Sequence, residues 1–254
     1  QMLFFKLARS RPQKTAERLV GMVKEALPAG YDVEKHFKPP YNPWDQRLCL
    51  VPDNDIFEAI KNGKASVVTD HIERFTETGL KLKSGEELPA DIVVTATGLE
   101  LQTAGGIEVS VDGKPVVWKD TFIYKGMMYA DIPNMANVFG YTNASWTLKA
   151  DLTSEFFCRM INYMDQEHYA VFTPRVRGEI KDVPFVDFSS GYFQRAIDRL
   201  PKQGDKAPWK LNHNYAVDMM NLRFGDIATP EMEFKGEPPV RLAVANDRVP
   251  DAAE

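Results

Sequence analysis

The sequence predicts a mixed α/β protein that carries a small antiparallel β meander. Residues 71–88 alternate apolar and polar side chains between turn signals, which is typical of strands with one solvated face. Residues 91–98 form a continuous run rich in β-branched side chains, which favours a strand buried on both faces of a parallel sheet. Residues 146–164 repeat apolar side chains at helical spacing. Buried and half-buried strands together with a long helix indicate α/β or α+β architecture.

Composition excludes several classes of protein. The 254 residues, 44% hydrophobic and 26% charged, are ordinary for a globular chain of about one and a half to two domains. The net charge of −5 leaves no excess of Lys and Arg for a phosphate backbone, so we expect no nucleic-acid partner. No apolar run approaches the roughly 18 residues of a membrane span. Cys49 and Cys158 lack CxxC spacing, which argues against a disulfide scaffold and a zinc site and favours a cytoplasmic location.

Common nucleotide-binding and hydrolase motifs are missing from the sequence. No two of the 16 glycines lie two positions apart, so the GxGxxG fingerprint of dinucleotide-binding domains is excluded. Neither Gly63-Lys64 nor Gly113-Lys114 is followed by Ser or Thr, which excludes a P-loop. The four histidines are too dispersed for HExxH, and no serine has the glycines of a nucleophile elbow.

The first quarter of the chain predicts two helices and two strands. Residues 16–27 carry apolar side chains at helical spacing between Pro12 and a Pro-Ala-Gly stop, so we expect a helix there. Its basic face offers contact with a membrane surface or a nucleotide phosphate, or plain solvation. Residues 55–62 predict a short helix closed by a glycine, and residues 48–51 and 65–70 predict short strands.

The rest of the chain predicts a hairpin, a strand and two helices. Residues 107–118 form a hairpin that turns at Asp112-Gly113, a dipeptide that tolerates positive φ. Residues 134–140 predict a short strand leading into the long helix. Residues 193–200 predict an amphipathic helix, and the chain beyond Thr229 is expected to be an extended or disordered tail.

The turn between the strand at 134–140 and the long helix is the best candidate site from residues alone. A helix N-terminus offers unpaired N–H groups and positive dipole charge to an anion or a flavin carbonyl. The alternative is simple capping by Thr142, Asn143 or Ser145. Gly98 ends the predicted buried strand at a sheet edge where ligands bind, or it is only a turn glycine. Arg47 is suited to holding an oxyanion, or it is a solvated surface arginine.

The order of these motifs resembles the second half of Baeyer–Villiger flavoprotein monooxygenases. The resemblance rests on residues 36–52, with Tyr-Asn-Pro-Trp-Asp-Gln-Arg at 41–47, on residues 91–98, on 124–128 and on 139–151. It covers most of residues 17–215. It implies a partial flavoprotein of the two-dinucleotide-binding-domain (Rossmann) type, with FAD and NADPH as cofactors.

The resemblance also implies a domain organisation. Residues 1–70 match the end of the NADPH-binding domain, residues 71–168 the returning part of the FAD-binding domain, and residues 169–254 a C-terminal extension and tail. The family's two GxGxxG motifs and its FxGxxxHxxxW fingerprint precede the matched region and are absent from this sequence. We therefore expect a fragment that is inactive by itself.

Site residues follow from the same resemblance. Arg47 matches the catalytic arginine, which stabilises the anionic peroxide formed on the flavin and helps to position the nicotinamide. The segment from Asn143 through Ala144, Ser145 and Trp146 to Thr147 matches the helix start that contacts the flavin, within a match that begins at Gly140, and Gly98 matches a glycine near the domain boundary. The implied partners are O2 and a ketone or a thioamide-like substrate.

Two other hypotheses remain open from sequence. The chain is alternatively a non-catalytic remnant or the assembly partner of a separate flavin-binding polypeptide. Half of a flavin disulfide reductase is disfavoured, because Cys49 and Cys158 do not match a redox dithiol. Self-association and peripheral membrane contact stay undecided.

Overall fold

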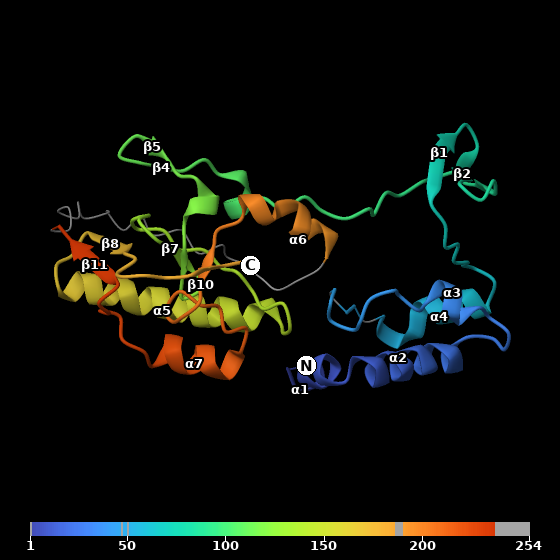
Figure 1. Cartoon of the computed structure of the whole chain (residues 1–254), viewed down its shortest axis with the longest axis horizontal. Coiled ribbons are helices and arrows are strands. Elements are labelled where there is room, and N and C mark those ends of the chain that lie inside the picture. Colours follow the sequence, from blue (N-terminus) through green and yellow to red (C-terminus); the bar gives the residue numbers. More distant parts are fainter. Residues whose placement is uncertain (1, 47, 50, 186–189, 237–254) are drawn as a thin grey trace, which may run out of the picture. The chain divides into compact units, whose positions relative to one another are not determined.

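The computed structural model describes residues 2–46, 48–49, 51–185 and 190–236 (Figure 1). The chain divides into two compact units. Unit 1 comprises Gln1–Leu101 with Asp187–Ala196, and unit 2 comprises Gln102–Val186 with Ile197–Glu254. The boundaries expected at residues 70 and 168 therefore do not coincide with the division into compact units. The assignment of these segments to nucleotide-binding domains stays a prediction.

Unit 1 begins with helices. They are α1 (Met2–Ser10), α2 (Pro12–Ala26), α3 (Val33–His36), the short 3₁₀ turn η1 (Pro52–Asn54) and α4 (Asp55–Lys61). The predicted helices at 16–27 and 55–62 are confirmed as α2 and α4, whereas α1 was not predicted. A small core of Leu27, Val33 and Ile60 holds these helices together. The strands expected at 48–51 and 65–70 are wrong for the described residues, which form loops there.

The antiparallel meander of unit 1 is confirmed. Its strands β1 (Ile72–Thr76), β2 (Gly79–Leu82) and β3 (Glu87–Pro89) pair in that order, with Phe75 opposite Leu80 and Leu80 opposite Leu88. Turns at 77–78 and 83–85 connect them, where the sequence placed Gly and Ser signals. Short helix α6 (Gly191–Ala196) also belongs to unit 1, and its Arg195 donates a hydrogen bond to the carbonyl oxygen of Leu99.

The buried parallel strand expected at residues 91–98 is wrong. These residues have no strand assignment, and the side chains of Ile92 and Val94 are 83% and 82% exposed. All strand pairs among the described residues are antiparallel. A β-branched run forms a buried strand only where neighbouring strands satisfy its backbone groups and cover both faces, and the described part of this chain supplies no such neighbours.

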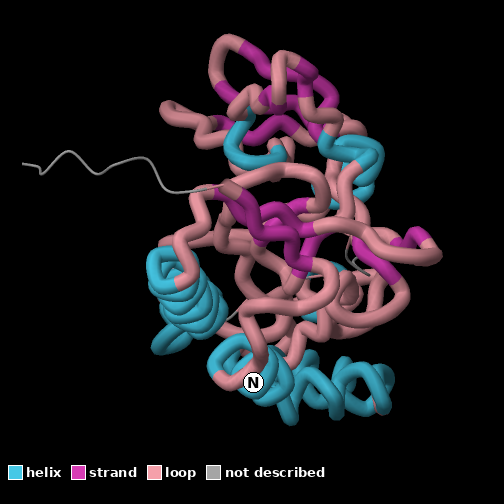
Figure 2. Tube along the Cα trace, turned by 90° about the vertical axis from the view of Figure 1, so that its left-hand side faces the viewer, coloured by secondary structure: helices cyan, strands magenta, loops and turns pink. Residues whose placement is uncertain are grey.

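Unit 2 contains short two-stranded antiparallel pairs and two helices joined by loops. Figure 2 shows the helices, strands and loops of the chain in different colours. The predicted hairpin is confirmed as β4 (Ser110–Val111) and β5 (Lys114–Pro115), with positive φ at Asp112 and Gly113. The strand expected at 134–140 is wrong, because these residues form a loop. The remaining elements are η2 (Thr103–Gly106), η3 (Trp118–Asp120), β6 (Ile123–Tyr124), β7 (Met128–Tyr129), α5 (Trp146–Gln166), β8 (Val171–Pro174), β9 (Asp182–Val183), η4 (Ile197–Arg199), β10 (Gln203–Gly204), α7 (Tyr215–Arg223) and β11 (Met232–Lys235).

The last third of the chain completes the core of unit 2. Helix α5 buries Leu152, Phe156 and Met160 in a cluster that also contains Trp209 and Leu222. Strand β11 pairs with β8, so the expectation of a tail beyond Thr229 is wrong for Met232–Lys235. Residues up to Lys235 are thus part of the same folded body as α5 and not an appendage. None of the described helices is both long and apolar enough to cross a membrane.

Candidate functional site

A cavity of about 360 Å³ lies in unit 2, beside the loop that leads into α5. Its walls come from five segments: the tip of the β6–β7 hairpin, the loop before α5, Lys149 of α5 itself, residues 207–213, and α7 with the loop after it. The volume is in the range of small-molecule sites, which run from roughly 300 to 1,000 Å³. Side chains that matter below are Lys125, Phe139, Tyr141, Lys149, Leu211, His213, Asp218, Leu222 and Glu231.

The start of α5 is open to a ligand. Ser145 occupies the N-cap position, but no side chain caps the helix, and the Ser145 hydroxyl instead lies 2.7 Å from the hydroxyl of Thr147. The simple-capping alternative is therefore wrong for this helix. Trp146 is half exposed and packs against Phe139, with ring centroids 5.5 Å apart. Helix N–H groups without a side-chain cap are the groups that bind anions and carbonyl oxygens.

Residue 140 is a glycine whose missing side chain leaves room for the ring of Trp146. A Cβ at this position would lie 2.2 Å from the Cγ atom of the Trp146 ring, a distance that no real contact reaches. The chain can turn into α5 here only if residue 140 has no side chain or if the indole moves.

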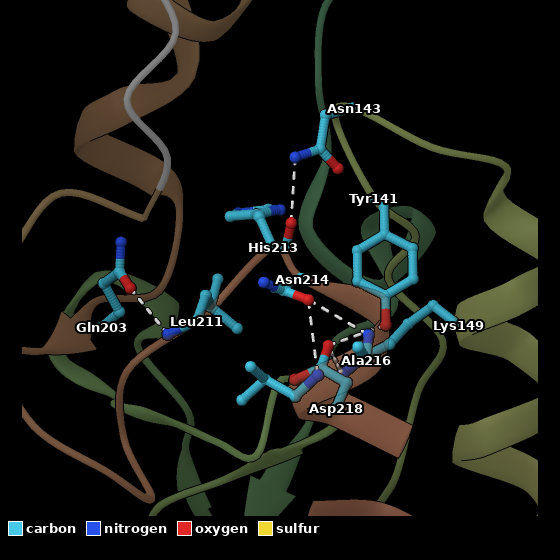
Figure 3. A network of polar contacts seen from close by, with 10 residues as sticks. Tyr141, Asn143, Lys149, Gln203, Leu211, His213, Asn214, Ala216 and Asp218 are labelled. Carbon is cyan, nitrogen blue, oxygen red and sulfur yellow. Dashed lines mark hydrogen bonds and ion pairs between the residues drawn. The ribbon is translucent and has the colours of Figure 1, made fainter. Parts of the chain in front are cut away.

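Asn143 ties the turn to the segment before α7. The side chain is 5% exposed, and its Nδ2 donates to the carbonyl oxygen of His213 at 2.9 Å (Figure 3). The Asn143 Oδ1 atom is buried without a hydrogen-bond partner, and so is Nε2 of His213. Burial lowers the pKa of His213, so the imidazole is neutral at physiological pH. Unpaired buried polar atoms are uncommon in folded proteins and indicate room for a further hydrogen-bond partner.

A buried charged network lies under the same turn. The Lys149 ammonium lies 2.9 Å from Oδ2 of Asp218, and the Tyr141 hydroxyl donates to the same oxygen at 2.8 Å (Figure 3). Both charged side chains are buried, so the ion pair is strongly coupled to the fold. Burial, followed by the hydrogen bond to Asp218, raises the pKa of Tyr141 above its usual value and keeps the phenol protonated. Oδ2 of Asp218 therefore links α7 both to Lys149 of α5 and to Tyr141 of the turn.

Lys125 is a second, partly buried lysine that lines the cavity. Its ammonium donates to the carbonyl oxygen of Asp226 at 3.2 Å and lies 4.7 Å from the centre of the Phe156 ring. Burial lowers the pKa of Lys125 to about 8, helped by the charge of Arg159, while the carboxylates of Asp226 and Glu231 act in the opposite direction. The Lys125 ammonium is therefore mostly protonated at pH 7 and loses its proton around pH 8.

This pKa predicts how stability depends on pH. Between about pH 8 and the ordinary lysine value of 10.5 the unfolded chain holds a proton that folded Lys125 has lost, so unfolding free energy rises with pH in that window. Lys125→Met removes this dependence. Wild type should gain about 3 kcal/mol relative to Lys125→Met between about pH 7 and pH 10.5, since each pKa unit corresponds to about 1.4 kcal/mol. Denaturant unfolding of both proteins measures the difference, and a difference independent of pH would contradict it.

The structure brings together only some of the predicted site residues. Gly140 lines the cavity, and the segment from Asn143 through Ala144 to Thr147 surrounds the open end of α5. Gly98 lies in unit 1 with φ of +105°, a conformation that favours glycine. Arg47 lies outside the described residues. Its neighbour Asp45 is held by Arg9 of α1 at 2.7 Å.

Sequence reasoning missed most of the cavity. The expected apolar face of α5 included Trp146 and Ile161, but both are substantially exposed, and the buried face includes Lys149 instead. A charged residue in the buried face is hidden from a hydrophobic pattern because its partner, Asp218, lies far along the sequence. Among the described residues no group of His, Cys, Asp and Glu could hold a metal ion, and both cysteines are free.

Comparison with known proteins identifies relatives over almost the whole chain. The FAD-containing monooxygenase EthA of Mycobacterium tuberculosis is 53% identical over 228 residues, which are 89% of this chain and 47% of EthA. This chain is a relative of the FAD-containing monooxygenases. The resemblance to a flavoprotein monooxygenase expected from the sequence is therefore confirmed, and the Baeyer–Villiger subtype stays a prediction.

Two further relatives agree with this identification. The probable FAD-binding monooxygenase AlmA of Acinetobacter baylyi is 46% identical over 229 residues, or 87% of this chain and 45% of AlmA. The putative FAD-containing monooxygenase MymA of M. tuberculosis is 42% identical over 220 residues, or 86% of this chain and 44% of MymA. The chain spans about half the length of the curated relatives it matches. No family model and no solved structure matches it.

Proposed function

We propose that this chain forms part of an FAD- and NADPH-dependent monooxygenase of Baeyer–Villiger type. Such an enzyme transfers one oxygen atom from O2 to a ketone, giving an ester, or to a sulfur centre such as that of a thioamide. The observation that carries the proposal is the 53% identity to an FAD-containing monooxygenase over 89% of the chain. Reduced FAD supplies the activated oxygen, and the protein binds, orients and shields it.

The residues at the start of α5 fit a flavin. The uncapped N–H groups of the first turn suit a carbonyl or phosphate oxygen, and the buried Oδ1 of Asn143 is an unused acceptor for an N–H group. The half-exposed indole of Trp146 offers a flat surface beside them. Asn143, Ser145, Trp146 and Thr147 would hold the cofactor, and the Asp218 network would keep their turn in place.

Arg47 takes the catalytic role in this proposal. A guanidinium is charged at every physiological pH, and a fixed cation stabilises negative charge that develops on oxygen during the reaction. The described residues around it are held in place, because Arg9 anchors Asp45 and the rings of Phe5 and Trp44 pack edge to face with centroids 5.4 Å apart.

The exposed run at residues 91–98 supports a domain assignment as well. Ile92 and Val94 have the side chains of a buried strand but are more than four-fifths exposed. We assign residues 71–168 to the returning part of a flavin-binding domain whose remainder covers these side chains, and residues 1–70 to the end of an NADPH-binding domain. The alternative, in which a separate flavin-binding polypeptide covers the run, explains the same exposure equally well.

Copurified flavin tests the proposal. We expect the longest reading frame that contains this chain to purify with FAD, and the 254-residue chain alone to purify almost without it, since no GxGxxG segment is present to hold the pyrophosphate. Flavin absorbance near 450 nm, a general property of oxidised flavins, measures the occupancy of both proteins. Stoichiometric flavin on the 254-residue chain would refute the expected division, and flavin-free protein from the longest frame would refute the function.

A further inference from the structure

Lys125 lines the cavity of unit 2, and its ammonium has hydrogen-bond donors that the described residues do not use. It lies at the tip of the β6–β7 hairpin with φ of +49°, a left-handed conformation that few residues other than glycine adopt. Its backbone N–H donates to the carbonyl oxygen of Pro208 at 2.8 Å, which fixes the tip against the opposite wall. An ammonium has three donors, and within the described residues only the carbonyl of Asp226 accepts from it.

The charges around the cavity leave Lys125 without a counterion. Lys149 and Asp218 neutralise each other across 2.9 Å. Arg159 of α5 donates to carbonyl oxygens at the end of α7, including those of Leu222 and Gly225. No carboxylate lies within ion-pair distance of Lys125 in the described part of the chain; Asp226 and Glu231 act on it only through space. A partly buried cation that has no counterion attracts an anion.

The remaining walls determine what kind of anion fits. Phe139, Leu211 and Leu222 give the cavity apolar surface, which suits a hydrocarbon body. Three lysines line the cavity, but Asp218 neutralises Lys149 and Lys210 is exposed, so Lys125 is the partly buried cation left for a ligand. With Glu231 nearby, this ammonium favours one negative charge over two. Phosphate sites in proteins commonly use arginine forks, and no arginine is among the residues that line this cavity.

We propose that this cavity binds a small organic acid, with its carboxylate on the ammonium of Lys125 and its hydrocarbon part against Phe139 and Leu211. The site needs no flavin, so it is independent of the proposed monooxygenase function and can be tested on the 254-residue chain. It assigns a second ligand to unit 2, on the hairpin side of the cavity.

Two matched probes test the site. Hexanoate carries the charge, and hexanamide has the same length without it. Ligand-detected NMR titration of the chain should give an affinity for hexanoate at least about tenfold higher than for hexanamide, because the charge-assisted hydrogen bond exists only for the carboxylate. Lys125→Met should remove this preference while leaving hexanamide binding unchanged. Lys114→Met removes an exposed lysine of unit 2 that does not line the cavity and should leave both affinities unchanged.

Several outcomes would overturn the proposal. They are equal affinity for the two probes, no binding of hexanoate by wild type, and retention of the preference in Lys125→Met. If Lys125→Met does not fold by circular dichroism, Lys125→Gln replaces it with the same expectation. Displacement of bound hexanoate by FAD would place the cofactor in this cavity and would also overturn the assignment. Failure of any of these tests leaves the flavin measurements unaffected, so the two proposals fail separately.

Discussion

Arg47→Ala, made in the longest reading frame that contains this chain, should slow oxygenation of the substrate by about 10²–10³-fold. Removing one preorganised group that stabilises developing negative charge typically costs this much. Reduction of the flavin by NADPH should fall far less, because hydride transfer develops no oxyanion beside the guanidinium. The two half-reactions therefore separate the role of Arg47 from a general loss of structure.

Rapid-mixing measurements distinguish the two steps. Anaerobic reduction by NADPH gives the first rate, and product formation after mixing reduced enzyme with O2 and substrate gives the second. Arg18→Ala is a matched control, because Arg18 is an exposed arginine of α2, and both rates should be unchanged. Equal loss of both rates in Arg47→Ala would remove the catalytic role assigned to it.

Asp218→Ala should be the most destabilising single change in unit 2. It leaves the ammonium of Lys149 buried without a partner and the hydroxyl of Tyr141 without its acceptor. Breaking a buried ion pair from one side costs about 3–5 kcal/mol, since the remaining charge stays desolvated. Asp182→Ala is the control, because the ion pair of Asp182 with Lys202 is largely exposed and should contribute at most about 1 kcal/mol.

Denaturant unfolding of the chain measures both effects. The double variant Asp218→Leu with Lys149→Met removes both charges and should recover most of the lost stability, because apolar replacement of a whole buried pair is often neutral. A loss below about 1 kcal/mol in Asp218→Ala would mean that the buried network does not hold the turn before α5.

Local sequence patterns predicted the elements whose stability is local. Helices α2, α4 and α5, the meander and the turn at Asp112-Gly113 all appear where helix spacing, alternation and turn residues place them. The strand predicted at residues 91–98 is wrong, because the stability of such a strand is not local. A parallel strand depends on neighbours that are distant in sequence, and without them among the described residues the same side chains lie exposed.

In the candidate site, too, features set by local sequence were predicted and features set by distant residues were not. The open start of α5 was predictable, because a strand-like segment, a glycine, a polar turn and a long helix follow in order. Tyr141 lies inside that segment, but its partner Asp218 is 77 positions away and sits in a helix that the sequence did not predict. From the sequence, Lys125 was noted only as a member of segment 124–128, one of the segments that carry the family resemblance. Its burial depends on Phe156 and on the loop at Asp226, which no local pattern reveals.

Oxygen-isotope transfer tests the central claim most directly. The longest reading frame that contains this chain would be incubated with NADPH, ¹⁸O2 and a simple cyclic or aliphatic ketone, and the product analysed by mass spectrometry. We expect one ¹⁸O atom in an ester or lactone product, with one NADPH consumed per product formed. NADPH consumption without label in any product, or no flavin-dependent oxidation of ketone or thioamide substrates at all, would contradict a monooxygenase function for this chain.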